Sequence, residues 1–143
     1  MTNPLLAEWT GPFGLPPFDA IEDADFGPAL EAALAEDLAE VVGVADAAEP
    51  PTFANTIEGL MCCGATLDRV TGVFFNLAGS DSTPAREALM REYSPKLAAH
   101  AAAIYGNRPL FDRIRSLFDD LERKRDIAEF LELPKSGEGV RIF

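Results

Sequence analysis

Apolar residues recur at intervals of three and four along most of the chain, which is the period of an amphipathic helix. The longest such segment runs from Pro51 to Ser80, and Asn55 with Glu58 three residues later is typical of a helix start. One apolar stripe comprises Ile57, Leu60, Gly64, Leu67, Thr71, Phe74 and Ala78, and a second comprises Cys63, Val70, Val73 and Leu77. Because these stripes cover much of the circumference, we expect this segment to be the buried central helix of an all-α domain.

A helix is also predicted before this segment. Asp25 is a plausible cap, Pro28 suits a first turn, and Pro50-Pro51 predicts an end near Ala48. Its expected apolar face comprises Phe26, Leu30, Ala33, Leu34, Leu38, Val41 and Ala45. Its expected solvent face comprises Glu31, Glu36, Asp37 and Glu40.

Two more helices are predicted after it. Thr83-Pro84 starts the third, Tyr105-Gly106-Asn107 closes it, and Pro95 predicts a bend within it. Its apolar stripe comprises Ala85, Leu89, Tyr93, Leu97, Ala101 and Ile104. The fourth starts at Asn107 or Arg108; we expect an inward face of Leu110, Ile114, Leu117, Leu121 and Ala128, with Phe111 and Phe118 as a second edge.

The expected organisation is a single helical domain, residues 26–132, between two different ends. Residues 1–25 are rich in proline and aromatic residues, so we expect an extended arm whose side chains fill grooves on the helical body. Residues 133–143 form a tail of uncertain order. The predicted fold is therefore a bundle of about four long helices preceded by an arm.

Charge is unevenly distributed along this chain of net charge −12. Residues 1–68 hold 13 Asp and Glu and no Lys or Arg, whereas residues 69–143 hold 11 acids and all 12 bases. This acidity argues against nucleic acid or an anionic membrane as a partner. The acidic half either serves solubility as a solvated surface, or faces a basic partner or the basic region at 113–125.

Cys62 and Cys63 are adjacent on the predicted helix, where neighbouring side chains point apart, so we expect two core thiols and no disulfide. Such thiols fit a reducing compartment. The first residues lack a basic stretch followed by an apolar run, and the longest charge-free apolar run, 70–80, is shorter than a membrane span. We therefore expect a cytoplasmic protein.

Candidate chemistry is sparse. His100 is the only histidine and neither His-Glu-x-x-His nor Cys-x-x-Cys occurs, so we expect no zinc site and a packing or hydrogen-bonding role for His100. Gly137-Glu138-Gly139 follows no predicted strand and does not indicate a nucleotide site. Four acids lack the spacing of a calcium loop: Asp19, Glu22, Asp23 and Asp25. No residue is assigned a catalytic, cofactor-binding or metal-binding role.

Several ordered blocks resemble the N-terminal region of bacterial peptidyl-dipeptidases, zinc metallopeptidases of the thimet oligopeptidase and oligopeptidase A family. The blocks are Asn3-Pro4-Leu5-Leu6, Pro12 to Phe18, Phe26 to Leu30, Pro51 to Glu58, Leu67 to Val70, Val73 to Leu77, Ser94 to His100 and Leu110 to Ile114. The resemblance covers about residues 3–120 and fades after about Glu122. Asp25 stands where such sequences usually have histidine.

The resemblance implies a mostly helical domain beside a channel that admits oligopeptides. It also implies zinc chemistry on a downstream His-Glu-x-x-His helix that has no counterpart here, so this chain, read as a truncated relative, is expected to hold no cofactor and to be inactive alone. Three roles follow: an inert N-terminal domain, an interaction module that self-associates or binds a missing catalytic region, or, less strongly, an oligopeptide binder. The suggested contact face comprises Phe111, Phe118 and the edge 73–77.

Overall fold

The computed structural model describes residues 3–132, with side chains up to residue 125, and this part of the chain is all-α. The four long helices are α1 (Asp23–Ala45), α3 (Ala65–Ser80), α4 (Pro84–Tyr105) and α5 (Arg108–Glu132). The shorter elements are the 3-10 turns Pro12–Gly14 and Phe18–Ala20, the π-helix Phe53–Glu58 and α2 (Gly59–Met61). The predicted all-α bundle of four long helices is confirmed, and the predicted tail 133–143 lies outside the described residues.

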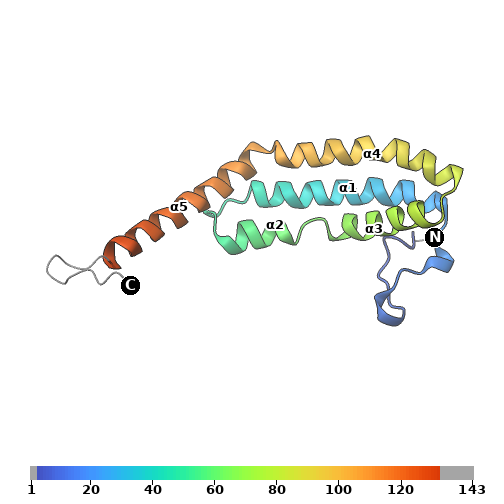
Figure 1. Cartoon of the computed structure of the whole chain (residues 1–143), viewed down its shortest axis with the longest axis horizontal. Helices are drawn as coiled ribbons and strands as arrows, with labels where there is room; N and C mark the ends of the chain where they lie inside the picture. The colour runs from blue at the N-terminus through green and yellow to red at the C-terminus, as the bar shows by residue number, and fades with distance from the viewer. Residues whose placement is uncertain (1–2, 133–143) are drawn as a thin grey trace, which may run out of the picture.

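The middle helix of the bundle is α1, with α4 on one side and α2 and α3 on the other (Figure 1). The prediction that the segment Pro51–Ser80 forms one central helix is wrong, because that segment is divided into a π-helix, α2 and α3. The N-cap of its first turn is Thr52, whose hydroxyl accepts from the Asn55 N–H at 3.1 Å. The Asn55 side-chain oxygen in turn accepts a hydrogen bond from the Thr52 N–H. Asn55 is therefore the N3 residue of a capping box, and the predicted N-cap is instead Thr52.

Gly64 separates α2 from α3. Its φ is +77°, in the left-handed region that glycine adopts without a Cβ penalty, and its N–H donates to the Glu40 carboxylate at 2.8 Å. A Cβ at this position would lie 3.0 Å from Asp37 Oδ1. Glycine is therefore required both by the backbone turn and by the close approach of α1.

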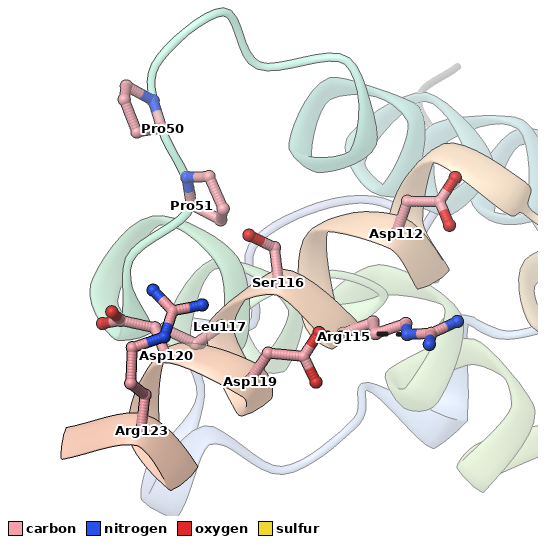
Figure 2. A pocket seen from close by; sticks show the side chains of 9 residues that line it. All are labelled: Pro50, Pro51, Asp112, Arg115, Ser116, Leu117, Asp119, Asp120 and Arg123. Carbon is pink, nitrogen blue, oxygen red and sulfur yellow. Dashed lines mark ion pairs between the residues drawn. The ribbon is translucent and has the colours of Figure 1, made fainter. Parts of the chain in front are cut away.

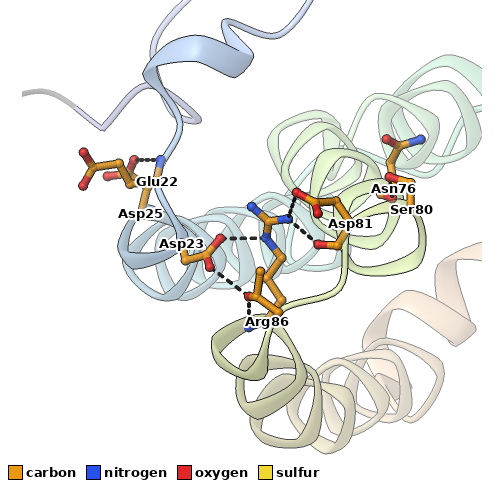
Figure 3. Close-up of polar contacts among 8 residues, drawn as sticks. Glu22, Asp23, Asp25, Asn76, Ser80, Asp81 and Arg86 are labelled. Atoms are coloured by element: carbon orange, nitrogen blue, oxygen red, sulfur yellow. Dashed lines mark hydrogen bonds and ion pairs between the residues drawn. The ribbon is translucent and has the colours of Figure 1, made fainter.

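The start of α1 is fixed by a reciprocal pair of hydrogen bonds. Glu22 is the N-cap, and its own N–H donates to Asp25 Oδ2 at 2.8 Å (Figure 3). Asp25, predicted as the cap, is instead the third helical residue that completes the capping box. The helix therefore begins at Asp23, and it ends at Ala45, short of the predicted Ala48.

The main core lies where α1, α3 and α4 meet. The Phe26 and Phe74 rings are 5.2 Å apart at an angle of 57°, a favourable tilted arrangement. The fully buried residues around them include Leu5, Leu30 and Val70, with Leu67 and Leu77 partly buried against them. A smaller second core joins α1 to α5 through Val41, Ala45 and Leu110.

The N-terminal arm is anchored at its beginning. Leu5 is fully buried, Asn3 donates to the Asp25 carbonyl at 2.8 Å, and the Arg69 guanidinium lies 5.0 Å from the Trp9 ring centre. The middle of the arm departs from the expectation, because Phe13 is 98% exposed with φ +62° and Leu15 is also exposed. Ile21, near the end of the arm, packs against the main core, so the groove-filling prediction is correct for both ends of the arm and wrong for its middle.

Helix α4 begins at the predicted Thr83-Pro84 and continues helically past Pro95, and the predicted bend there stays a prediction. Helix α5 begins at Arg108 and runs away from the bundle (Figure 1). Leu110, near its start, is buried against α1, whereas Leu121 is 52% exposed, so the inward position predicted for Leu121 is wrong. The distal half of α5 extends beyond the end of α1 and has no described helix to cover it.

We predict opposite effects for two glycine-to-alanine substitutions. Gly64→Ala should lower the free energy of unfolding by more than about 1 kcal/mol, because Ala resists the left-handed backbone and meets Asp37. Gly72→Ala, in α3 with open space around the added methyl, should raise it by about 0.5–1 kcal/mol. Urea unfolding measures both, and equal effects of the same sign would contradict the turn.

Two neighbouring phenylalanines on α3 test the position of the core. Phe74→Ala removes a fully buried ring and should cost about 3–5 kcal/mol of unfolding free energy. Phe75→Ala, whose ring is 44% exposed, is the matched control and should cost much less. If urea unfolding gives similar losses for both variants, the orientation assigned to α3 is wrong.

Candidate functional site

Among the ion pairs of the described residues, the most buried joins Asp37 of α1 to His100 of α4. Asp37 Oδ2 lies 2.6 Å from His100 Nε2, and both side chains are about nine-tenths buried. The hydrogen-bonding role predicted for His100 is therefore observed, but the solvent-facing position predicted for Asp37 is wrong. Asp37 lies four residues from the buried Ala33 and Val41 and hence on the inner face of α1.

A cavity of about 300 Å³ adjoins this pair and is lined by Asp37, Val41, Leu60, Cys63, His100, Ala101, Ile104 and Tyr105. The Cys63 thiol donates to the Gly59 carbonyl at 3.3 Å. Burial, followed by the nearby charges of Glu40 and Asp37, raises the pKa of this thiol. A raised pKa favours the neutral thiol over the nucleophilic thiolate, so a cysteine, a histidine and a carboxylate meet here without an activated nucleophile.

The two cysteines occupy different environments. Cys63 is half-buried, whereas Cys62 is exposed, so the prediction of a core thiol is wrong for Cys62. The two side chains are adjacent and point apart, and only Cys63 lines the cavity beside Asp37 and His100. Both thiols are free, in agreement with the prediction that they form no disulfide.

The acidic cluster near the start of α1 is occupied by structural contacts (Figure 3). Arg86 Nε lies 2.6 Å from Asp23 Oδ1, and Arg86 Nη1 lies 3.0 Å from Asp81 Oδ2. Thr83 donates its hydroxyl to Asp23 while it caps α4 through the Arg86 N–H. Arg86 thus ties the first turn of α1 to the α3–α4 connection, and its own pKa is raised mainly by the bond to Asp23.

Two acids of this cluster are engaged in structural contacts. Asp23 forms an ion pair with Arg86 and accepts a hydrogen bond from the Thr83 hydroxyl, and Asp25 accepts a hydrogen bond from the Glu22 N–H. Within residues 3–132 no group of three or more histidine, cysteine, aspartate or glutamate side chains is placed to hold a metal ion.

A second cleft of about 410 Å³ lies between the Pro50-Pro51 connection and α5 (Figure 2). Its α5 wall comprises Asp112, Arg115, Ser116, Leu117, Asp119, Asp120 and Arg123. Arg115 lies 3.9 Å from Asp119, and Lys124, one turn beyond, lies 2.7 Å from Asp120 and lowers the pKa of that carboxyl. These exposed, mixed charges suit contact with a charged protein segment, and no histidine or cysteine lines the cleft.

None of the helices within residues 3–132 combines the length and apolar character needed to cross a membrane.

The chain aligns with two curated peptidases over most of its length. It is 33% identical to dipeptidyl carboxypeptidase of Salmonella typhimurium over an alignment of 117 residues. This alignment covers 82% of this chain and 17% of that enzyme. It is also 33% identical over 120 residues to the Escherichia coli enzyme, 84% of this chain and 18% of the relative. The chain is distantly related to dipeptidyl carboxypeptidases. It spans less than a fifth of the length of these relatives, and no protein-family model matches it.

A shorter match involves a protein of a different kind. A stretch of 32 residues, 22% of this chain, is 66% identical to the heat-inducible transcription repressor HrcA of Agrobacterium fabrum and covers 9% of that repressor. The two alignments, of 120 and 32 residues, are together longer than the chain of 143 residues, so the two regions of similarity overlap.

We predict that His100→Ala destabilises the chain by about 3 kcal/mol, because it leaves the buried Asp37 carboxylate without its partner. The matched control is Lys96→Ala, which removes another contact between α4 and α1, the 2.5 Å ion pair with Glu31. That pair is exposed and screened by water, so its loss should matter far less. Similar urea midpoints for the two variants would contradict the structural importance of the buried pair.

Proposed function

We propose that the chain is a non-catalytic helical domain of the dipeptidyl carboxypeptidase type. The observation that carries this proposal is the 33% identity over more than four-fifths of the chain, joined to a sequence that contains one histidine and no His-Glu-x-x-His. The ordered blocks between Asn3 and Ile114 support an origin in the N-terminal region of such enzymes. A zinc-dependent peptidase needs several side chains that bind the zinc ion and a general base that takes a proton from the zinc-bound water.

The chain's own residues do not fit that zinc centre. The one histidine is already bound to Asp37 in the interior, and the acids nearest the arm are held by Arg86 and by the cap of α1. The Cys63 thiol has a raised pKa and donates to a backbone carbonyl. These contacts favour a structural role for the polar groups and leave hydrolysis to a catalytic region outside the chain.

The HrcA-like stretch does not support a DNA-binding function. It covers only 9% of the repressor, and a net charge of −12 opposes contact with a phosphate backbone. Because the peptidase-like blocks occupy residues 3–114, we infer that this stretch lies toward the carboxyl end, in α5 and beyond. In that case α5 combines sequence of two origins, and its distal half is not a surface inherited from peptidases.

A second candidate function is an interaction module. The observation that favours it is the apolar surface of α5, where Phe111, Phe118 and Leu121 are each more than half exposed. Contiguous exposed apolar side chains on a helix usually mark a contact surface. This role is compatible with the first, since a domain without a catalytic centre still serves by binding.

The purified chain, supplied with zinc and an oligopeptide, should release no dipeptide above the buffer background. The physical reason is that the sequence lacks the ligand set for a catalytic zinc ion. Chromatographic detection of products measures this, with the Escherichia coli dipeptidyl carboxypeptidase as positive control. Hydrolysis by the chain that a chelator abolishes would refute the non-catalytic assignment.

A further inference from the structure

One edge of α5 presents alternating aromatic and charged side chains to solvent. Phe111, Arg115, Phe118 and Glu122 are spaced by four, three and four residues, so they lie along one line of the helix. We name these four residues the free strip. Phe111 is 51% exposed and Phe118 is 58% exposed. Glu122 is also exposed, and the Arg115 side chain is 64% exposed.

The other side of α5 is already engaged with the bundle. Leu110 is buried in the second core, and Arg113 donates to the carbonyls of Ala47 and Glu49 at 2.7 and 3.0 Å. These contacts fix the rotation of α5 about its axis. The free strip is therefore held outward by the attachment of the opposite side, as a preformed contact surface.

Electrostatics restrict which part of one molecule can approach another. Residues 1–107 carry 16 acids and four bases, so the bundle repels a second bundle. Residues 108–125 of α5 carry six bases and four acids. Two copies therefore meet with the least repulsion along α5.

We propose that the free strip of α5 binds the same strip of a second copy in an antiparallel pair centred on Phe118. Arg115 lies three residues before Phe118, and Glu122 lies four residues after it. In an antiparallel pair each Arg115 therefore lies beside Glu122 of the second copy, twice by symmetry. The two Phe118 rings lie together at the two-fold axis, which is the arrangement of an isologous dimer.

A parallel pair in register is disfavoured by the same residues. It would set Arg115 against Arg115 and Glu122 against Glu122, and like charges at facing helix positions are repulsive. The antiparallel order converts both contacts into attractive ones. The charge pattern thus selects the direction of pairing, while the aromatic residues supply the apolar area.

A second copy suits this strip better than the catalytic body of a peptidase. Arg115 and Glu122 both belong to the strip, so the strip carries its own charge complement. A self-complementary pattern needs only the chain itself. This proposal deepens the interaction role proposed above and does not depend on the non-catalytic assignment.

Sedimentation equilibrium on the full chain, over a wide concentration range, tests the pair. The unchanged chain should dimerise, and Phe118→Asp should raise the dimer dissociation constant at least about tenfold. Arg115→Glu should also weaken the dimer, because it faces Glu122 of the second copy. The double variant Arg115→Glu with Glu122→Arg should recover most of the lost affinity, since it reverses both members of each pair.

Two control variants separate the strip from general effects. Phe13→Asp removes an even more exposed aromatic ring from the arm, and Arg91→Glu breaks an exposed 3.9 Å pair with Glu87 on α4 that matches the Arg115–Asp119 pair on α5. Both should leave dimerisation unchanged, and circular dichroism should show the same helix content in all variants.

The outcomes distinguish the strip from the broader interaction role. A dimer that is insensitive to Phe118→Asp, or a double variant no better than Arg115→Glu alone, would overturn the α5 pairing and leave the interaction role standing. A chain that stays monomeric at every concentration would also overturn the α5 pairing, and it would restrict the interaction role to partners other than a second copy. Neither result bears on the hydrolysis experiment, so the non-catalytic assignment is tested separately.

Discussion

The structure depends on the burial of α1 on two sides at once. Its Phe26 ring meets Phe74 of α3 at 5.2 Å, while its Asp37 carboxylate meets His100 of α4 at 2.6 Å. A helix that contacts neighbours on both sides has to satisfy every polar group that it buries, because an unpaired buried carboxylate is costly. His100 meets this requirement. The single histidine of the chain thus stabilises an acid on the buried face of α1. Because His100 is bound in this way, it is not a free catalytic base.

The turn at Gly64 follows from the same constraint. The segment between Pro51 and Ser80 divides at Gly64, where Asp37 and Glu40 of α1 face it. Glu40 accepts the Gly64 N–H, and Asp37 occupies the volume that any larger residue would need. Next to this glycine, Cys63 is half-buried beside the cavity, whereas Cys62 is exposed.

Periodicity identified the helices because it reports which residues face away from water. The starts of α4 and α5 were predictable from Thr83-Pro84 and Asn107-Arg108, because local capping hydrogen bonds determine where these helices begin. The middle position of α1 was not, because its apolar face is no richer than that of Pro51–Ser80, and which helix lies between the others depends on contacts between distant residues. Asp37 was misplaced for a related reason: a charged residue suggests solvent unless its partner, 63 residues away, is known. The i, i+4 relation to Ala33 and Val41 was the available signal.

The separation of charge along the chain connects the fold to its surface. The bundle is acidic and α5 is nearly charge-balanced because all but four of the bases follow Asn107 in the sequence. Three of the four bases in residues 1–107 pair with acids: Arg86 with Asp23, Arg91 with Glu87 and Lys96 with Glu31. The remaining carboxylates give the surface its negative potential. That potential keeps bundles apart and leaves α5 as the part through which contact is least opposed. Phe111 and Phe118 are exposed on a stretch of α5 where six bases accompany four acids, so electrostatic repulsion opposes the proposed pairing less there than it would on the acidic bundle.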